Sequence, residues 1–354
     1  MLHSEMSIRE RWIAAITFSE LDRLPFWPKI TKGYENKYGG GLWDKIKWDR
    51  PGPGYNPIKY AGQKCSEKVS MVDDRKITEY ITPNGTLRAV EHYDAASSSY
   101  HPIEFPVKCA EDIKLLTDFF RDRISIIDTS IENQTDMDES TFCPFTTCHT
   151  SPMMLWLQHQ AGIDNGHFFL MDHQKLVEEL FDAMQASISG RADKLSEITN
   201  AELIFMSENT STTLISPDQY RRYCKKHLIE TGDIIHKNGR RMCLHMCGFI
   251  RDLLTDINEV NADAFEALTP PPVANTTFAD ARKECPRVCL IGGTGATTWL
   301  KPINKIIEEI EMRLDELPDH RGIVVSSGGV LPPDCPPDKV IKVFDWIKSY
   351  KPRL

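Results

Sequence analysis

The chain has 354 residues, and 42 Lys+Arg against 51 Asp+Glu leave a formal net charge of −9. This acidic balance, without a basic stripe, argues against a nucleic-acid-binding protein. Hydrophobic residues make up 41% of the chain, enough for a sizeable core, which excludes general disorder. No apolar stretch reaches the roughly 18 residues of a membrane span, and the charged N-terminus lacks the apolar segment of a secretion signal. We therefore expect a cytoplasmic protein with reduced cysteines.

The first third of the chain begins with an amphipathic helix over 5–18 and a short apolar strand over 24–28. Residues 30–110 are rich in turns and hold too few apolar residues for a core of their own. Within them, Asn84-Gly85 lies between two alternating segments, which predicts a β-hairpin.

From about residue 120 onward, short apolar strands alternate with helical patterns. The expected strands are Ile124–Asp128, Phe142–Cys148, Leu203–Ser207, Met242–Cys247, Ala264–Leu268, Val288–Gly292 and Ile323–Ser326, and the expected helices are 152–161, 174–198, 217–238, 249–258, 278–284, 302–316 and 338–349. With the early strand this makes about eight strand–helix units. The pattern predicts an α/β fold, a closed (β/α)8 barrel. A doubly wound sheet is the rival fold, but no GxGxxG motif opens an early strand–helix turn.

We interpret 1–354 as a single barrel domain, in which 30–110 is an N-terminal elaboration that caps the barrel mouth. Its aromatic residues, Trp43 and Tyr60 among them, could cover an apolar ligand there, although plain packing explains most of them. Active sites of such barrels lie where the strands end. Polar residues at expected strand ends are therefore the candidates, including Cys148 and His149 as possible substrate contacts.

The sharpest strand end is His245-Met246-Cys247-Gly248. Alternate residues of a strand share a face, so Cys243, His245 and Cys247 should point the same way. His245 and Cys247 would supply two of the four ligands of a tetrahedral zinc site. The alternative is an ordinary barrel interior, since free cysteines are often buried.

Glu266 lies on the next strand and is an inward carboxylate at the barrel rim. It needs a cation or hydrogen-bond donors, which either a metal or a salt bridge would provide. Gly292, Gly293, Thr294 and Gly295 follow another strand. Their backbone N–H groups could bind a phosphate or another anion of a cofactor, or the loop could simply require positive φ angles.

Five segments occur in an order that resembles the uroporphyrinogen decarboxylase superfamily, and within it the corrinoid-dependent methyltransferases. They are 22–28 (DRLPFWP), 216–223 (SPDQYRRY), 244–248 (LHMCG), 292–295 (GGTG) and 326–333 (SSGGVLPP). The resemblance implies a (β/α)8 barrel. It also implies zinc bound by the His-x-Cys pair and a later cysteine, in enzymes that exchange methyl groups between a corrinoid and a thiol or another acceptor.

The chain departs from that pattern after the last strand. The methyltransferases typically carry a cysteine in this loop, whereas the chain reads Ser327-Gly328-Gly329-Val330. Cys335 and Glu266 are therefore the alternatives for the third zinc ligand. Glu208 and Asn209, at a neighbouring strand end, are the candidate catalytic residues and reserve ligands.

Losing a thiolate ligand makes zinc more electron-poor, which favours polarising an ether oxygen over activating a thiol. We therefore expect a zinc enzyme that demethylates a small methoxylated compound and passes the methyl group to a corrinoid protein. Methyl transfer from a corrinoid to a thiol or tetrahydrofolate is the alternative. A decarboxylase fits worse, because 28–34 holds lysines but no arginine for a polycarboxylate. A non-catalytic barrel and a homo-oligomer both stay open.

Overall fold

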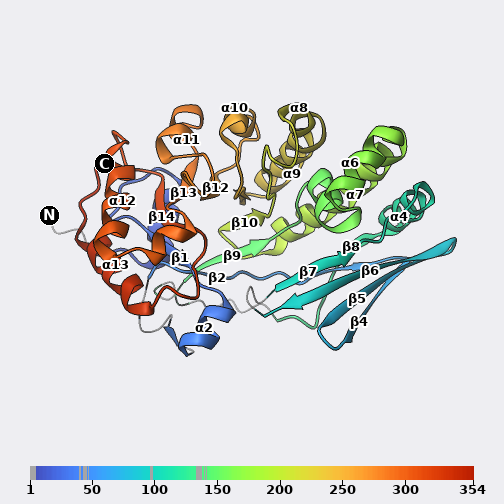
Figure 1. Ribbon diagram of the computed structural model, residues 1–354, viewed down its shortest axis with the longest axis horizontal. Helices are drawn as coiled ribbons and strands as arrows, with labels where there is room; N and C mark the ends of the chain where they lie inside the picture. The colour runs from blue at the N-terminus through green and yellow to red at the C-terminus, as the bar shows by residue number, and fades with distance from the viewer. Residues whose placement is uncertain are drawn as a thin grey trace.

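The computed structural model describes residues 5–39, 41–42, 46, 48–95, 99–132, 138, 140 and 142–354. Its centre is an eight-stranded parallel sheet that curves into a nearly closed barrel, surrounded by helices (Figure 1). The strands follow one another around it in chain order: β1 (Phe26–Lys29), β2 (Pro51–Pro53), β9 (Cys143–Thr147), β10 (Leu203–Met206), β11 (Arg241–His245), β12 (Ala264–Leu268), β13 (Cys289–Gly293) and β14 (Ile323–Val330). The predicted (β/α)8 barrel is confirmed.

One expected barrel strand is wrong. The segment predicted as Ile124–Asp128 forms β8 (Ile124–Ile127), which pairs antiparallel with β3 (Ile58–Ala61) outside the barrel. Its place in the barrel belongs to β2, which runs parallel to β9. The backbone hydrogen bonds between β2 and β9 involve Arg50 O and Gly54 N, because the two prolines of β2 carry no N–H. Prolines are tolerated on such an edge strand. Because Pro51-Gly52-Pro53 shows no hydrophobic alternation, the sequence pattern does not predict this strand.

The helices lie mostly where the sequence predicts them. They are α1 (Ile8–Ile16), α2 (Lys32–Tyr38), α4 (Ala110–Asp122), α5 (Pro152–Leu155), α6 (Ile163–Asp172), α7 (Gln174–Ile198), α8 (Pro217–Tyr220), α9 (Lys226–Lys237), α10 (Leu254–Asn258), α11 (Phe278–Glu284), α12 (Ile303–Asp315) and α13 (Pro337–Ser349). Ser7 with Glu10, and Ser216 with Gln219, close capping boxes at the starts of α1 and α8. None of the helices in these described ranges is long and apolar enough to cross a bilayer.

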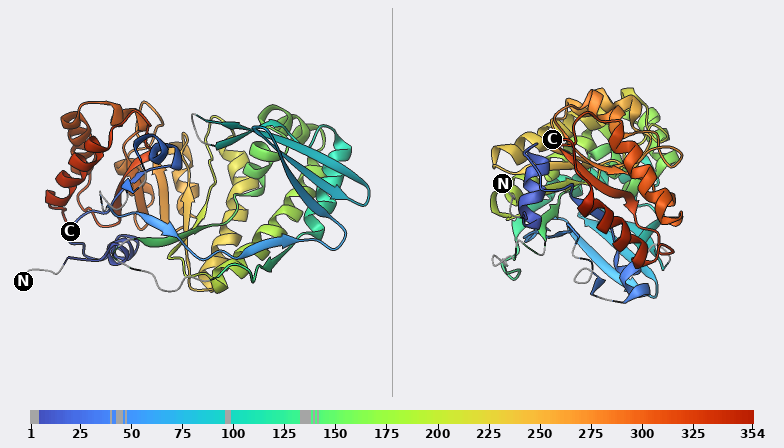
Figure 2. Two further views of the ribbon diagram at one scale, coloured as in Figure 1. Left: turned by 90° about the horizontal axis from the view of Figure 1, so that it is seen from below. Right: turned by 90° about the vertical axis from the view of Figure 1, so that its left-hand side faces the viewer.

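The N-terminal elaboration contains a four-stranded antiparallel sheet: β4 (Ser66–Val72), β5 (Arg75–Thr82), β6 (Gly85–Asp94) and β7 (Ser99–Glu104). β5 and β6 form the predicted hairpin, with Pro83 and Asn84 at its turn. Helix α4 packs against these two strands and against α7. Figure 2 shows the sheet to one side of the barrel, at the end of the molecule away from both termini. Trp43 lies outside the described residues.

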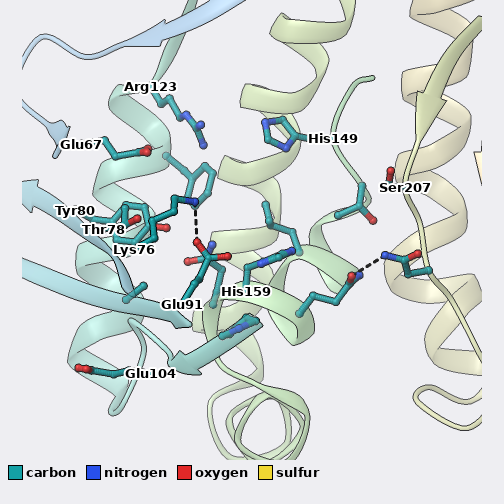
Figure 3. A pocket seen from close by; sticks show the side chains of 18 of the residues that line it. Glu67, Lys76, Thr78, Tyr80, Glu91, Glu104, Arg123, His149, His159 and Ser207 are labelled. Atoms are coloured by element: carbon teal, nitrogen blue, oxygen red, sulfur yellow. Dashed lines mark hydrogen bonds and ion pairs between the residues drawn. The ribbon is translucent and has the colours of Figure 1, made fainter. Parts of the chain in front are cut away.

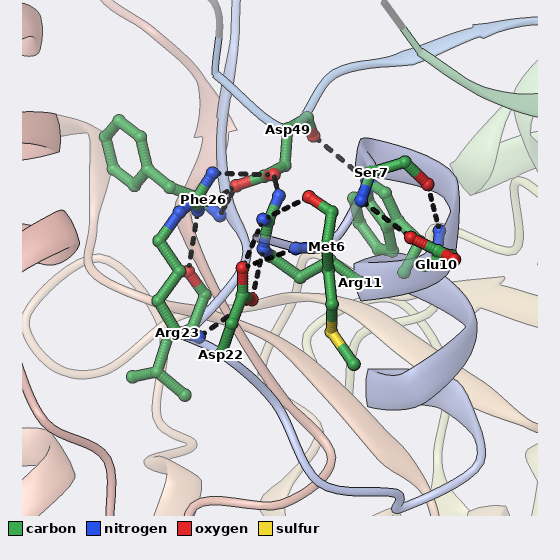
Figure 4. A network of polar contacts seen from close by, with 10 residues as sticks. Met6, Ser7, Glu10, Arg11, Asp22, Arg23, Phe26 and Asp49 are labelled. Atoms are coloured by element: carbon green, nitrogen blue, oxygen red, sulfur yellow. Dashed lines mark hydrogen bonds and ion pairs between the residues drawn. The ribbon is translucent and has the colours of Figure 1, made fainter. Parts of the chain in front are cut away.

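A buried ionic network ties together the amino-terminal ends of the first barrel strands (Figure 4). Arg11 of α1 binds Asp22 through Nε (2.7 Å) and Asp49 through Nη1 (2.6 Å). The side chain of Asp49, fully buried, also pairs with Arg23 (2.5 Å) and accepts a hydrogen bond from the Phe26 amide (3.0 Å). Because this end of a (β/α)8 barrel serves stability, these contacts give part of the 22–28 motif a structural role.

Candidate functional site

The carboxyl ends of β1, β11 and β12 bring three charged side chains together. His245 is the last residue of β11 and lies beside Glu266 of β12 in register. Its Nδ1 contacts Glu266 Oε2 in a short hydrogen bond. Lys29, the last residue of β1, places its Nζ 3.0 Å from Glu266 Oε1. The fully buried carboxylate therefore has the cation that its position requires.

The backbone is distorted directly after Glu266. Ala267 has a φ of +73°, and the register between β12 and β13 shifts between Glu266 and Leu268. The same bend brings Leu268 O so close to Gly292 that a Cβ there would lie 2.2 Å from it. Bulges of this kind are frequent next to active sites, where they re-aim a side chain. The distortion therefore lies directly beside Glu266, where it can influence the direction of this side chain.

Cys247 lies beyond the end of its strand. β11 stops at His245, two residues earlier than predicted, so Cys247 is an exposed loop residue while Cys243 is buried inside the barrel. The Cys247 thiol contacts His245, and its Sγ is 3.8 Å from Asn209 Oδ1. Gly248 lets the chain turn away, since a Cβ there would lie 2.3 Å from the side chain of a neighbouring loop. The structure thus brings His245, Cys247 and Asn209 together.

These contacts shift the pKa values of the cluster. Burial lowers the pKa of His245, but hydrogen bonds with Cys247 and Glu266 outweigh it and raise this pKa to about 9. The hydrogen bond with His245 lowers the pKa of Cys247. Burial raises the pKa of Glu266, but Lys29 and His245 reverse the effect and lower it. The cluster therefore favours negative charge on the sulfur and the carboxylate, and positive charge on the imidazole.

The donor atoms of this cluster are those that zinc binds. An imidazole nitrogen, a thiolate and a carboxylate oxygen are all common zinc ligands, and the buried Oε1 of Glu266 is engaged only by the ion pair with Lys29. Within the described ranges, however, no group of three His, Cys, Asp or Glu side chains already has a metal-binding arrangement. His245 and Cys247 fit as a ligand pair, whereas Glu266 would have to loosen its ion pair with Lys29 to join them.

Cys335, the other expected third ligand, is buried just before α13. Its carbonyl accepts a hydrogen bond from Tyr34 Oη (2.5 Å), and burial raises the pKa of its thiol to about 11. Among the described residues, no contact joins it to His245 or Cys247. The predicted loop over 327–330 is strand instead, because β14 continues to Val330.

Glu208 and Asn209 differ in their surroundings. The buried Glu208 carboxylate accepts hydrogen bonds from Thr150 Oγ1 (2.8 Å) and from the amide and hydroxyl of Ser151 (2.8 and 2.6 Å). It joins the loops that follow β9 and β10, and burial raises its pKa. Asn209, with a φ of +50°, donates its backbone N–H to His245 O (2.9 Å), and its side-chain oxygen faces Cys247. Of the two, only Asn209 has a side chain that faces Cys247.

The residues Gly292, Gly293, Thr294 and Gly295 are buried and engaged in packing. Gly293 has a φ of +92°, and a Cβ there would collide with the ring of Phe278. The Thr294 hydroxyl donates to a backbone carbonyl of β14 (2.7 Å) and accepts from an indole N–H (3.0 Å). These contacts favour the structural explanation of the glycines; anion binding by this loop stays a prediction.

A cavity of about 360 Å³ adjoins this cluster (Figure 3). It lies between the antiparallel sheet and the loops that follow β9 and β10, and the residues proposed as substrate contacts, Cys148 and His149, line it together with Asn209. Tyr60 borders an adjoining hollow that shares Arg123 with it. Most of the residues that line the cavity are polar, so it does not resemble the purely apolar site that the aromatic residues could have covered.

Lys29 is a site residue that the sequence interpretation missed. It ends the first barrel strand, so the strand-end rule that selected His245 and Glu266 applies to it equally. Its position at a strand end is visible in the sequence, but its contact with Glu266 is formed by a long side chain that reaches across the barrel mouth.

A sequence model of the family described as uroporphyrinogen decarboxylase (URO-D) matches residues 105–350. No curated protein sequence matches the chain. Among solved structures, a methyltransferase from Methanosarcina mazei is similar over 98% of this chain and 99% of its own, with a TM-score of 0.58 and 15% identity. A putative vitamin-B12 independent methionine synthase from Listeria monocytogenes is similar over 60% of this chain and 66% of its own, with a TM-score of 0.36 and 16% identity. The first of these similarities shows a common fold.

Proposed function

The chain belongs to the uroporphyrinogen decarboxylase family, and we propose that it acts there as a zinc-dependent methyltransferase. In this proposal it demethylates a small methoxylated compound and passes the methyl group to a corrinoid protein. The observation that carries the proposal is the contact between His245 and Cys247 beside the buried Glu266, at the mouth of the barrel. The fold shared with a structure named as a methyltransferase is compatible with it.

Each residue of the cluster has a distinct task. His245 and Cys247 would hold the metal. When bound, the metal would act as a Lewis acid on the ether oxygen that is separated from the methyl group. Glu266 accepts the Nδ1–H of His245, which fixes the tautomer and leaves Nε2 for the metal. Lys29 keeps Glu266 ionised in this role. To serve as the third ligand instead, Glu266 would have to give up this hydrogen bond, because a metal on Nε2 lies on the other side of the imidazole ring from Nδ1.

Zinc content tests the metal site directly. We expect about one zinc per chain in the purified protein and near-complete loss of zinc in His245→Ala and Cys247→Ala. His173→Ala and Cys109→Ala are matched controls, since neither residue contacts the cluster among the described residues, and both should retain the metal. Retention of zinc by both site variants would overturn the proposed site.

The direction of transfer needs a second assay. We expect cob(I)alamin to become methylcobalamin, seen in its absorbance spectrum, when a small methyl ether is supplied, and Cys247→Ala to abolish the change. Demethylation of methylcobalamin by a thiol or tetrahydrofolate, without the first reaction, would favour the alternative direction. Absence of both reactions across a panel of methyl ethers and acceptors would refute the methyltransferase proposal.

A further inference from the structure

The cavity beside the cluster contains polar atoms without partners. Arg123 Nε, His149 Nε2, Gln158 Nε2 and Gln160 Oε1 are all buried, and none of them has a hydrogen bond in the described structure. All four residues line the same cavity. Buried polar groups in proteins are almost always hydrogen-bonded, so several unsatisfied groups around one cavity indicate a ligand that pairs with them.

Arg123 is the unusual member because it carries a charge. Its guanidinium stacks on the ring of Tyr60, with Cζ 3.4 Å from the ring centroid, and it forms no ion pair with any described residue. The carboxylate that acts on it most strongly, Glu67, is exposed and makes no contact with it. A second guanidinium, that of Arg191, also lies over the Tyr60 ring at 5.3 Å and is bonded to neutral oxygens. The Tyr60 ring is therefore flanked by two guanidiniums, and neither forms an ion pair with a described residue.

Apart from Glu67, the other charged groups that line the cavity are already paired. On the sheet side, Lys76 Nζ lies 2.7 Å from Glu91 Oε2 (Figure 3). Glu104 is bound by Arg88 and Lys108 at the rim. Burial works against the charge of Arg123 and lowers its pKa, yet an arginine stays protonated in a protein. A partly buried cation without a counter-ion is costly, and a ligand carboxylate would remove that cost.

The cavity also reaches the candidate active site. Asn209 lines it and lies 3.8 Å, measured from its Oδ1, from the sulfur of Cys247. Figure 3 shows Arg123 and Ser207 on different sides of the cavity, with the His149 ring directed into the space between. One end of the cavity thus offers an unpaired cation, and another end borders the metal-binding pair.

We propose that this cavity binds the substrate as a small organic acid, whose carboxylate pairs with Arg123 while its methyl-bearing end lies at Asn209 beside Cys247. The proposal rests on the proposed methyl transfer and names its substrate class. The fork of a guanidinium matches a carboxylate in two parallel hydrogen bonds. A volume of about 360 Å³ suits a small molecule. His149, whose pKa burial lowers to about 3, stays neutral and serves as a hydrogen-bonding partner without adding charge.

Calorimetric titration of the full chain tests this without corrinoid. The probes are 4-methoxybenzoate and methoxyacetate, each compared with its uncharged amide. We expect at least one carboxylate to bind at least tenfold more tightly than its amide, and Arg123→Gln to remove this preference. Arg121→Gln, an exposed residue in the last turn of α4 just before Arg123, is the matched control and should leave binding unchanged.

Because Arg123 packs on Tyr60, Arg123→Gln could lose binding through misfolding alone, and a second variant separates the two causes. Arg123→Lys keeps the charge but loses the fork, so it should weaken carboxylate binding while leaving amide binding as it is. Equal binding of carboxylates and amides, no binding of either carboxylate, or a preference that survives both Arg123 variants would overturn the inference. An Arg123-dependent preference without any methyl transfer would instead refute the proposed function and leave the cavity's ligand class intact.

Discussion

The ion pair at the barrel mouth allows a stability change to be worked out from its geometry. In Lys29→Met the side chain keeps its length but loses the ammonium that lies 3.0 Å from Glu266 Oε1. At an effective dielectric constant of about 20, two charges at this distance attract each other by about 5.5 kcal/mol. Lys29 is 22% exposed, which screens part of this attraction, and His245 still supports the carboxylate. Breaking such a buried pair should therefore cost about 3 kcal/mol.

Urea and thermal unfolding of chelator-treated protein measure this cost. With about 2.1 cal/mol/K of unfolding entropy per residue over 354 residues, 3 kcal/mol corresponds to a fall in Tm of about 4 °C. Lys37→Met is a matched control because it removes an exposed ion pair with Asp334, and it should leave the stability almost unchanged. The double variant Lys29→Met/Glu266→Gln should regain part of the loss, since no unpaired charge is left. A Lys29→Met variant as stable as Lys37→Met, or no recovery in the double variant, would refute the reasoning.

Two further predictions concern stability elsewhere in the barrel. The hydrogen bond from His236 to Asp263 (2.8 Å) raises the pKa of His236, although burial opposes the shift. The interaction should stabilise the folded protein by under about 1 kcal/mol. This stabilisation is complete below the unfolded pKa of about 6.5 and is lost as the pH rises through the folded pKa. Urea unfolding should thus show a larger deficit for His236→Gln at pH 5.5 than at pH 9, and equal deficits would contradict this origin. Gly292→Ala, at a φ of +153° and with its Cβ against a backbone oxygen, should lose at least about 3 kcal/mol in the same assay. Gly329→Ala, which enters open space, should change stability by under about 1 kcal/mol, and similar losses in the two variants would show that the close approach is unimportant.

The barrel could be predicted because most of its strands are continuous apolar runs with helices between them. The exception is instructive: Pro51-Gly52-Pro53 has no apolar alternation, and it forms a strand only because the neighbouring β9 offers hydrogen bonds to the residues on either side. Ile124–Ile127 has a strand-like sequence and does form a strand, but it pairs with β3. Local pattern determines whether a segment is extended; the partner is decided by tertiary packing.

The candidate site likewise has residues that the sequence could predict and residues that it could not. His245, Cys247 and Glu266 could be selected because strand periodicity and the position of strand ends are local properties. The role of Lys29 depends on a side chain that reaches Glu266 from a strand three places away in the sheet. The position of Cys335 depends on the path between β14 and α13, where Tyr34 holds its carbonyl. Contacts of this kind have no signature in one sequence.

Arg123 shows why the N-terminal elaboration matters for specificity. It follows α4, the helix that packs on the antiparallel sheet, and so belongs to no barrel strand. Around the cavity Lys76 pairs with Glu91 and Glu104 pairs with two cations, while Glu67 stays exposed, so Arg123 is the cation without an ion pair among the described lining residues. If the barrel mouth supplies the chemistry, the unpaired guanidinium supplies the selection of the substrate. Replacing Arg123 should then change which molecules bind, while zinc binding by His245 and Cys247 stays unaltered.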